Sequence, residues 1–435
     1  MPKALPIFDN HRPPELELLS DCVHCGFCLP NCPTYMLWGN EADSPRGRIY
    51  LMKLGLEGQL KLSDQLTHHI DNCLGCMACV TSCPSGVQYD KLIEATRSQI
   101  ERRFKRPGIE RAYRRMLFEI FPYPWRLRTL AIPLWFYQRS GLRTLLHRSK
   151  LLSILPKPLR AMEQIQPNVA WDAISSRTPA TPSIGVTRLR VGLLLGCVQR
   201  VFFDRVNQAT ARVLSAEGCD VIVPANQGCC GALMGHCGEE QLAMAFARKL
   251  IDAFDAAKVD VIAINSAGCG SAMKEYGHLL RDDFKYSERA KRFADKCQDI
   301  SEILCALEPR ARRRPLKMRV AFHDACHLQH AQRITSEPRR LLASIPELEL
   351  LSIEDPAICC GSAGIYNLLR PDAAQELGER KARNVAQTQA DVVVSGNPGC
   401  SMQIASNLGS VGCSMPVMHW IELLDASISG TKLER

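Results

Sequence analysis

The sequence predicts a multidomain chain of mixed α+β and α/β class, with an α-helical N-terminal domain followed by two duplicated α/β units. Two observations predict this architecture. A regular cysteine spacing occurs twice in the first ninety residues, and three cysteine-bearing landmarks of the second half recur about 130 residues further on. At 435 residues, the chain is long enough for two or three hydrophobic cores.

Cysteine is the unusual feature of the composition, at 21 residues. Many cysteines indicate either a disulfide-stapled secreted chain or metal sites in a reducing compartment. The first twenty residues lack the apolar run of a signal peptide and are interrupted by proline, aspartate and histidine, so metal binding is favoured. No apolar segment reaches the roughly 18 residues that span a bilayer.

The N-terminal cysteines form two identical motifs, C-x2-C-x2-C-x3-C-P, and each cysteine of the second motif lies 51 residues after its counterpart. Three cysteines in a tight loop can reach three irons of one cubane, whereas the fourth points away and, in two-cluster ferredoxins, binds the other cluster. Zinc knuckles also use C-x2-C pairs, but they do not need this doubled run with a trailing proline. The expected ligands of the two [4Fe–4S] clusters are Cys22, Cys25, Cys28 and Cys83 for the first, and Cys73, Cys76, Cys79 and Cys32 for the second.

Between the motifs, Ser44 followed by Pro45 predicts a helix start, and apolar residues follow at helical spacing. Arg46 and Arg48 fall in the first turn of this helix. They lie either near a cluster or partner, or in a solvated turn, and the sequence does not decide between these interpretations.

Residues 102–160 hold fifteen Lys or Arg against two acids, with aromatic residues between the arginines and prolines expected to divide the stretch into short helices. Such a segment suits an anionic membrane interface or an acidic partner subunit. A plain helical layer with a solvated basic face is the alternative. Nucleic acid, which is also bound by basic and aromatic residues, has no other support in the chain. Residues 161–188, rich in Pro, Ser and Thr, are expected to form a linker.

The second half repeats itself. Cys197, Cys229 and Cys269 recur as Cys326, Cys359 and Cys400 with offsets of 129, 130 and 131 residues, which indicates an internal duplication. The runs VGLLLGC, DVIAIN, RVAFHDAC and DVVVSGN are typical of buried parallel strands, and helical stretches follow them. Each half is therefore expected to be a small α/β unit.

Because the carboxyl ends of parallel strands form the binding crevice of such a sheet, four thiols should converge in each half. The candidate ligands are Cys197, Cys229, Cys230 and Cys269 in the first half, and Cys326, Cys359, Cys360 and Cys400 in the second. They hold one or two further iron–sulfur clusters, or serve as redox or structural thiols. The histidines at 323, 327 and 330 are interpreted equally well as ligands or as hydrogen-bonded residues at a helix start. The remaining cysteines, at 219, 237, 297, 305 and 413, are interpreted as small buried hydrophobic residues.

The expected domains are a two-cluster ferredoxin-type domain over 1–100, a basic aromatic connector and linker over 101–188, and cysteine-rich units over 189–315 and 316–435.

The chain resembles the iron–sulfur subunits of glycolate oxidase, also called glycolate dehydrogenase. The stretches that carry the resemblance are CVHCGFCLPNCPTY, DSPRGRIYLMK, SCPSGV, GCCGA, SAGCGSAMKEYG, LQHAQ, CCGSAG and HWIELL. The doublets are similar to the "CCG" domains of heterodisulfide reductase and anaerobic glycerol-3-phosphate dehydrogenase subunits. Unlike heterodisulfide reductase, the chain has Ala272 and Gln403 where that family has an extra cysteine.

The resemblance implies an electron-transfer subunit beside FAD-containing subunits that oxidise glycolate to glyoxylate, with D-lactate as a second substrate. Electrons would pass to a quinone or another acceptor at the cytoplasmic face of the inner membrane, with peripheral contact. No catalytic residue is expected on this chain, which lacks a G-x-G-x-x-G dinucleotide fingerprint after a strand. The alternatives are the corresponding subunit of a glycerol-3-phosphate or D-lactate dehydrogenase, and a heterodisulfide-reductase-like thiol redox protein.

Overall fold

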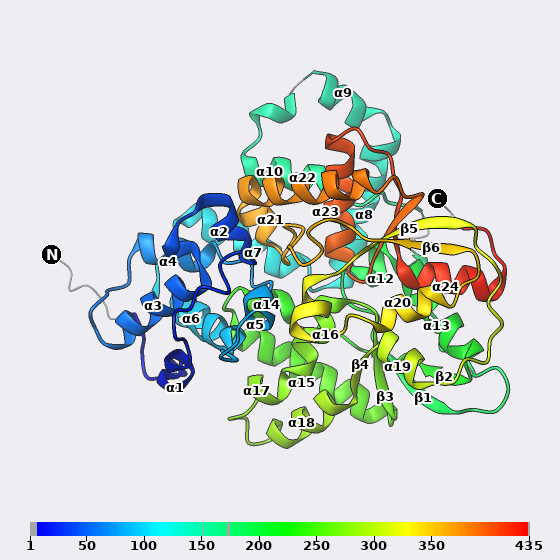
Figure 1. The fold of residues 1–435 in the computed structure, drawn as a ribbon, viewed down its shortest axis with the longest axis horizontal. Coiled ribbons are helices and arrows are strands. Elements are labelled where there is room, and N and C mark those ends of the chain that lie inside the picture. The colour runs from blue at the N-terminus through cyan, green and yellow to red at the C-terminus, as the bar shows by residue number, and fades with distance from the viewer. Residues whose placement is uncertain (1–6, 150, 172–174, 434–435) are drawn as a thin grey trace.

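The computed structural model describes residues 7–149, 151–171 and 175–433. Figure 1 shows a helical N-terminal domain at one end of the long axis and two α/β units side by side at the other. The order of the elements confirms the predicted mixture of a helical domain and two parallel α/β units.

Short helices around an apolar core make up the N-terminal domain. Helix α3 begins as predicted, because the Ser44 side chain accepts a hydrogen bond from the Gly47 backbone and Pro45 occupies the first turn. Ile49 and Met52 then point into the core. The elements are α1 (Leu16–Ser20), α2 (Pro33–Trp38), η1 (Glu41–Asp43), α3 (Pro45–Leu56), α4 (Asp64–Asp71), α5 (Ala78–Thr81) and α6 (Tyr89–Arg103).

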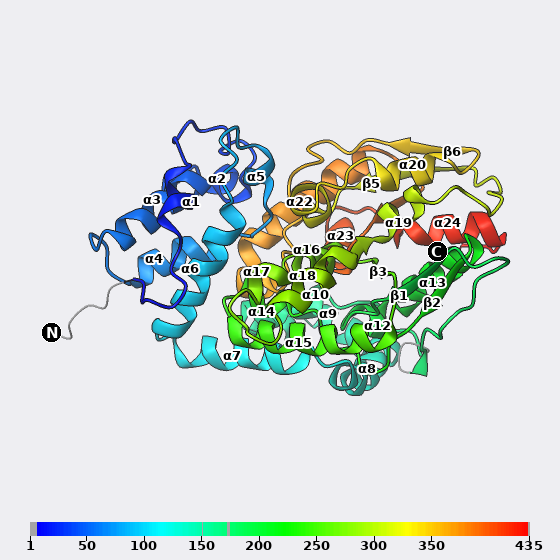
Figure 2. The ribbon, with the colours of Figure 1, turned by 90° about the horizontal axis from the view of Figure 1, so that it is seen from below.

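The connector is helical, and Figure 2 shows its first helix running along one edge of the molecule from the N-terminal domain to the α/β units. The expectation that prolines divide it into short helices is wrong at Pro133, which lies inside α8. The predicted linker also has structure, because α10 occupies its first residues and Thr181 pairs with Val221 at the edge of the first sheet. The elements are α7 (Gly108–Ile120), α8 (Pro124–Arg139), α9 (Leu142–Arg148), η2 (Leu151–Ile154) and α10 (Lys157–Gln164).

The first α/β unit contains a four-stranded parallel sheet with the strand order β2-β1-β3-β4. Its strands are β1 (Leu189–Leu193), β2 (Cys219–Ile222), β3 (Val261–Ile264) and β4 (Cys297–Asp299). Its helices are α12 (Gln199–Phe202), α13 (Asp204–Ala216), α14 (Ala232–His236), α15 (Glu240–Ala257), α16 (Ala267–Lys274), α17 (Tyr276–Leu279), α18 (Ser287–Lys296) and α19 (Ile300–Ala306).

The second unit repeats this topology with the order β6-β5-β7-β8, and the register repeats too. Val191 pairs with Val221 and Val261, and Val320 pairs with Leu350 and Val392. The predicted duplication is therefore confirmed. The elements are β5 (Met318–His323), η3 (His327–Ala331), α20 (Glu337–Ala343), β6 (Leu348–Leu351), α21 (Tyr366–Leu369), α22 (Pro371–Gln387), β7 (Val392–Ser395), α23 (Pro398–Ser410), β8 (Val417–His419) and α24 (Trp420–Ser429).

The last helix of each unit packs on the other unit. Helix α24 follows β8 but packs against α13, and α19 follows β4 but packs against α20. Two ion pairs fasten the first of these contacts, Arg212 to Asp425 at 2.7 Å and Arg205 to Glu422 at 2.9 Å. One hydrophobic core consequently contains residues of both sheets.

His419 joins the two units at the end of β8. Its Nδ1 accepts a hydrogen bond from the Ile421 backbone at 3.1 Å, and its Nε2 donates to the Asn265 carbonyl oxygen at 3.0 Å. Only the neutral imidazole satisfies both contacts, since protonation of Nδ1 would bring two N–H groups together. Burial lowers the pKa of His419 to about 3.

The stability of the chain should therefore fall on mild acidification. The stabilisation from neutral His419 is fully present above its unfolded pKa of about 6.5 and is lost as the pH falls from there toward about 3, which costs about 1.4 kcal/mol at pH 5.5. Urea unfolding of the anaerobic protein at pH 7.5 and 5.5 measures the loss. His419→Gln, which can still accept and donate, should show a smaller difference between the two pH values; an equal difference would contradict the assignment.

Candidate metal centres

Cys22, Cys25, Cys28 and Cys83, expected to bind the first cluster, line one void near the surface. Three of them precede α2, and Cys83 follows α5. Burial raises the pKa of Cys22, and the nearby Cys83 raises it further, so the two sulfurs are close together. Cys79 also borders this void. The fourth cysteine of the second motif thus lies with the first three of the first motif, which fits the crossed arrangement. We name Cys22, Cys25, Cys28 and Cys83 the outer set.

The expected ligands of the second cluster line a neighbouring void and form the inner set. They are Cys32, Cys73, Cys76 and Cys79. All four are buried, whereas Cys25 of the outer set is exposed. Cys32 comes from the first motif, at the start of α2, so this set also draws its fourth thiol from the other motif.

A buried arginine lies beside the inner set. Arg48 is 1 % exposed, and it donates to the His69 carbonyl oxygen at 2.6 Å and lies 3.4 Å from the Asp43 carboxylate. Burial opposes ionisation of Cys73, but Arg48 and Arg97 outweigh it and lower the pKa of this thiol. The thiolate is the form that binds metal, so the surroundings favour ligation.

Arg48 and Arg46, left open by the sequence, have different roles. Arg48 is buried among the inner set, so the interpretation as a solvated turn is wrong for it. Arg46 is partly exposed and donates to the His24 carbonyl oxygen at 3.0 Å, within the loop of the outer set. Arg97 was not singled out by the sequence; it donates to the Cys73 and His236 carbonyl oxygens. Four expected ligands line each void, with Cys79 bordering both, and buried cations lie beside the inner set; this arrangement fits two iron–sulfur clusters.

The four thiols of the first α/β unit converge as predicted. The sulfurs of Cys197 and Cys229 lie 3.5 Å apart, and Cys230 contacts both Cys229 and Cys269. The doublet lies in the loop before α14, as expected. Cys269 lies in the first turn of α16 and not at the end of β3 itself. The sulfurs therefore form a chain from Cys197 to Cys269.

The thiols of the second unit follow the same order. Cys326 and Cys359 lie 4.0 Å apart, and Cys360 contacts Cys359 and Cys400. Cys400 lies in the first turn of α23 and accepts a hydrogen bond from Asn397 at 3.3 Å. Cys326 packs in one apolar cluster with Cys76 of the inner set, so the two centres are neighbours.

The sequence did not decide whether His323, His327 and His330 are ligands or hydrogen-bonded residues, and the structure places them in different surroundings. His327 hydrogen-bonds the Gly75 carbonyl oxygen, and His330 bonds Thr81 and Ala357, so these two are the predicted hydrogen-bonded residues. His323 is different, because its ring lies beside the sulfurs of Cys360 and Cys400 and not beside a carbonyl or hydroxyl group. The signal that distinguishes it is its place at the end of a strand, three residues before a candidate ligand.

Of the cysteines outside these sets, Cys219 and Cys297 are buried as expected, and burial raises the pKa of Cys219 to about 11. Cys237, Cys305 and Cys413 are only half-buried.

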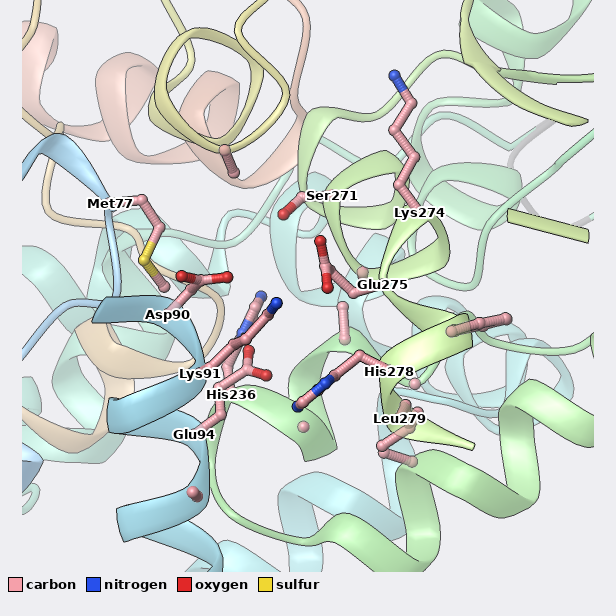
Figure 3. A pocket seen from close by; sticks show the side chains of 18 of the residues that line it. Met77, Asp90, Lys91, Glu94, His236, Ser271, Lys274, Glu275, His278 and Leu279 are labelled. Atoms are coloured by element: carbon pink, nitrogen blue, oxygen red, sulfur yellow. The ribbon is translucent and has the colours of Figure 1, made fainter. Parts of the chain in front are cut away.

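A cavity of about 290 Å³ lies between α6 and the helices α14, α16 and α17. Figure 3 shows acidic and histidine side chains facing one another across it. Burial raises the pKa of Asp90 and of Glu275, and burial lowers the pKa of His278 to about 4. Met77 of the inner-set loop and Cys230 of the first unit both border the cavity, so titratable side chains lie between these two groups of thiols.

Part of the basic stretch, residues 102–160, is buried. Arg106 and Arg114 are buried in ion pairs, whereas Trp125, Ile132 and Phe136 of α8 are exposed. Within the described ranges, no helix has both the length and the apolar character to cross a membrane.

Family models match four parts of the chain. A 4Fe-4S dicluster domain matches residues 18–87, and a model of the linker region of the glycolate oxidase iron-sulfur subunit matches residues 109–166. A cysteine-rich domain model matches twice, at residues 191–274 and 320–405. The dicluster match assigns residues 18–87 to a two-cluster iron–sulfur domain.

Several curated proteins are similar along the chain. A probable glycolate oxidase iron-sulfur subunit of Bacillus subtilis is 40 % identical over 95 % of both chains. The glycolate oxidase iron-sulfur subunit of Escherichia coli is 36 % identical over 96 % of this chain and 97 % of its own. Lactate utilization protein A of Bacillus licheniformis is 28 % identical over 55 % of this chain and all of its own.

Proposed function

Because the chain belongs to the family of glycolate oxidase iron–sulfur subunits, we propose that it transfers electrons from a flavoprotein partner that oxidises glycolate to glyoxylate. The proposal rests on two neighbouring cysteine-lined voids, in a chain that aligns with these relatives over nearly its whole length.

Oxidation of glycolate to glyoxylate releases two electrons and two protons, and a flavin accepts them as a pair. An iron–sulfur cluster supplies storage for one electron at a time. This chain holds the outer set at its surface and the inner set beneath it, with Arg48 beside the inner thiols. Added positive charge stabilises a reduced centre, so Arg48 should raise the reduction potential of the inner set relative to the outer one. Electrons would then move inward, from the exposed set to the buried one.

The FAD-containing partner would dock at the exposed Cys25 loop, where Val23 and Phe27 are also exposed. A quinone or another acceptor would receive the electrons. The exposed apolar side chains of α8 are our candidate for peripheral contact with the cytoplasmic face of the inner membrane, because aromatic residues beside arginines suit an anionic interface.

A second candidate substrate is D-lactate, since lactate utilization protein A resembles about half of the chain. The corresponding subunit of a glycerol-3-phosphate dehydrogenase and a heterodisulfide-reductase-like thiol protein are the remaining alternatives. Co-purification identifies the flavoprotein, and glycolate, D-lactate and glycerol-3-phosphate are then added separately to the anaerobic complex. Glycolate should produce the EPR signal of reduced clusters. A signal with another substrate alone would overturn the glycolate assignment and leave the electron-transfer role intact.

The metal content of the anaerobically purified chain should be at least about eight iron and eight labile sulfide, because the outer and inner sets each hold a [4Fe–4S] cluster. About twelve would mean that Cys197, Cys229, Cys230 and Cys269 hold a further cluster, as we propose for the first α/β unit. Iron and sulfide analysis on the same sample makes the measurement. Zinc in place of this iron would contradict the redox function.

A further inference from the structure

The two α/β units differ at one position beside their thiols. At the end of β5, His323 is 2 % exposed, and the polar atom beside its ring is the sulfur of Cys360. A thiol is a weak hydrogen-bond partner but a good metal ligand, so a buried imidazole beside cysteine sulfurs is a candidate for metal binding. The repeat offset of 129 residues places Leu194 at the equivalent position of the first unit, where no ligating atom is available.

His323 meets two cysteines. One nitrogen of its ring and the sulfurs of Cys360 and Cys400 all lie within 4.8 Å of one another, and all three residues are buried. Ligands of one tetrahedral ion bound through sulfur lie about 3.8 Å apart, given zinc–sulfur bonds of about 2.3 Å. The three donor atoms are therefore close enough to bind a single ion after small rotamer adjustments.

The thiols expected to bind clusters are spaced differently. Among the described residues, only His323, Cys360 and Cys400 form a group of three or more such ligands at this spacing, and neither the outer nor the inner set does. A cubane keeps its ligands apart because each binds a separate iron. The four thiols of the first unit likewise form a chain and not a group around one point. The compact geometry of the second unit thus indicates one ion.

We propose that the second α/β unit binds one zinc ion through His323, Cys360 and Cys400. Two thiolates and one imidazole form a donor set typical of zinc, with a fourth donor completing the tetrahedron. The site goes beyond the electron-transfer function proposed above. Zinc has no redox chemistry, so the electron route would not include this ion, and the two repeats would have diverged into a redox unit and a structural one.

The test begins with the anaerobically purified full chain, on which zinc and iron are measured together. The wild-type chain should contain about one zinc in addition to its iron. X-ray absorption at the zinc edge, which does not detect the iron clusters, should show sulfur and nitrogen neighbours in the same shell. A chain without zinc, or a zinc shell without a nitrogen neighbour, would overturn the proposal.

Variants then assign the ligands. His323→Leu copies the first unit and should lower bound zinc at least about fivefold while leaving the iron content unchanged. His323→Cys should retain zinc but replace the nitrogen neighbour with sulfur. His419→Gln is the matched control, since it alters another buried histidine of the same unit and should keep zinc. If His323→Leu does not fold, the His323→Cys spectrum still decides, and an unchanged nitrogen neighbour in that variant would exclude His323 as a ligand.

Discussion

Replacing Cys25 and Cys32 together should remove about eight iron atoms per chain, whereas replacing Cys25 and Cys83 together should remove only about four. In the crossed arrangement, Cys25 and Cys83 bind the same cluster, so replacing Cys83 as well as Cys25 removes no further iron. Cys25 and Cys32 bind different clusters, so both are lost. Iron and sulfide analysis of the two double serine variants, with EPR of the reduced samples, makes the comparison.

The reverse result, with about eight iron atoms lost from the Cys25 and Cys83 pair, would show that each motif holds its own cluster. Cys413→Ser serves as a control because Cys413 lies outside every candidate set, and it should keep all of its iron. Electron transfer from the flavoprotein should be abolished in both double variants, because each lacks the exposed outer centre.

Replacing Asp71 with Asn should lower the free energy of unfolding by about 1.5–3 kcal/mol, the usual contribution of a hydrogen bond to a charged group. The Asp71 carboxylate lies 2.7 Å from Arg106, 3.7 Å from Arg114 and 3.5 Å from Arg370. These arginines belong to the connector and the second unit. Burial opposes ionisation of Asp71, but Arg106 outweighs it and lowers the pKa of the carboxyl.

Arg106 and Arg114 would keep Glu101 and Glu110 as counter-charges, but they would lose the carboxylate at the end of α4 that they share with the partly exposed Arg370. The contact of α4 with the connector and the second unit should therefore weaken. Urea unfolding, followed through loss of the visible absorbance of the clusters, measures the change. Lys157→Met is the control, because it breaks the exposed ion pair between Lys157 and Asp372, which also joins connector and second unit, and should cost under about 1 kcal/mol. Equal changes in the free energy of unfolding for the two substitutions would show that the burial of Asp71 does not strengthen its ion pairs.

The local features were predictable from sequence because each depends on neighbouring residues. Ser44 and Pro45 were enough to predict the start of α3. The two sheets were predicted from β-branched runs that recur at a fixed repeat offset. The convergence of thiols in each unit followed from the same repeat, since parallel strands bring their carboxyl ends together.

Features that depend on distant contacts were not predictable. The basic stretch gave no sign that Arg106 and Arg114 would be buried, because they fold back onto Asp71 of another domain as well as pairing with the nearby Glu101 and Glu110. Pro133 was expected to end a helix, but α8 continues through it. The position of His323 at a strand end sets it apart from His327 and His330 in the sequence, but its contact with Cys360 and Cys400 could not be predicted, because these residues are distant in the chain.

The packing of α24 on α13 has a consequence for how the protein is made. Helix α13 stays uncovered until α24 has left the ribosome, because the helix that covers it follows about two hundred residues later. The four thiols of the first unit are thus held in an unfinished unit until α24 has been made. Removal of α24 alone should therefore destabilise the first unit, although its four thiols lie some two hundred residues earlier in the chain.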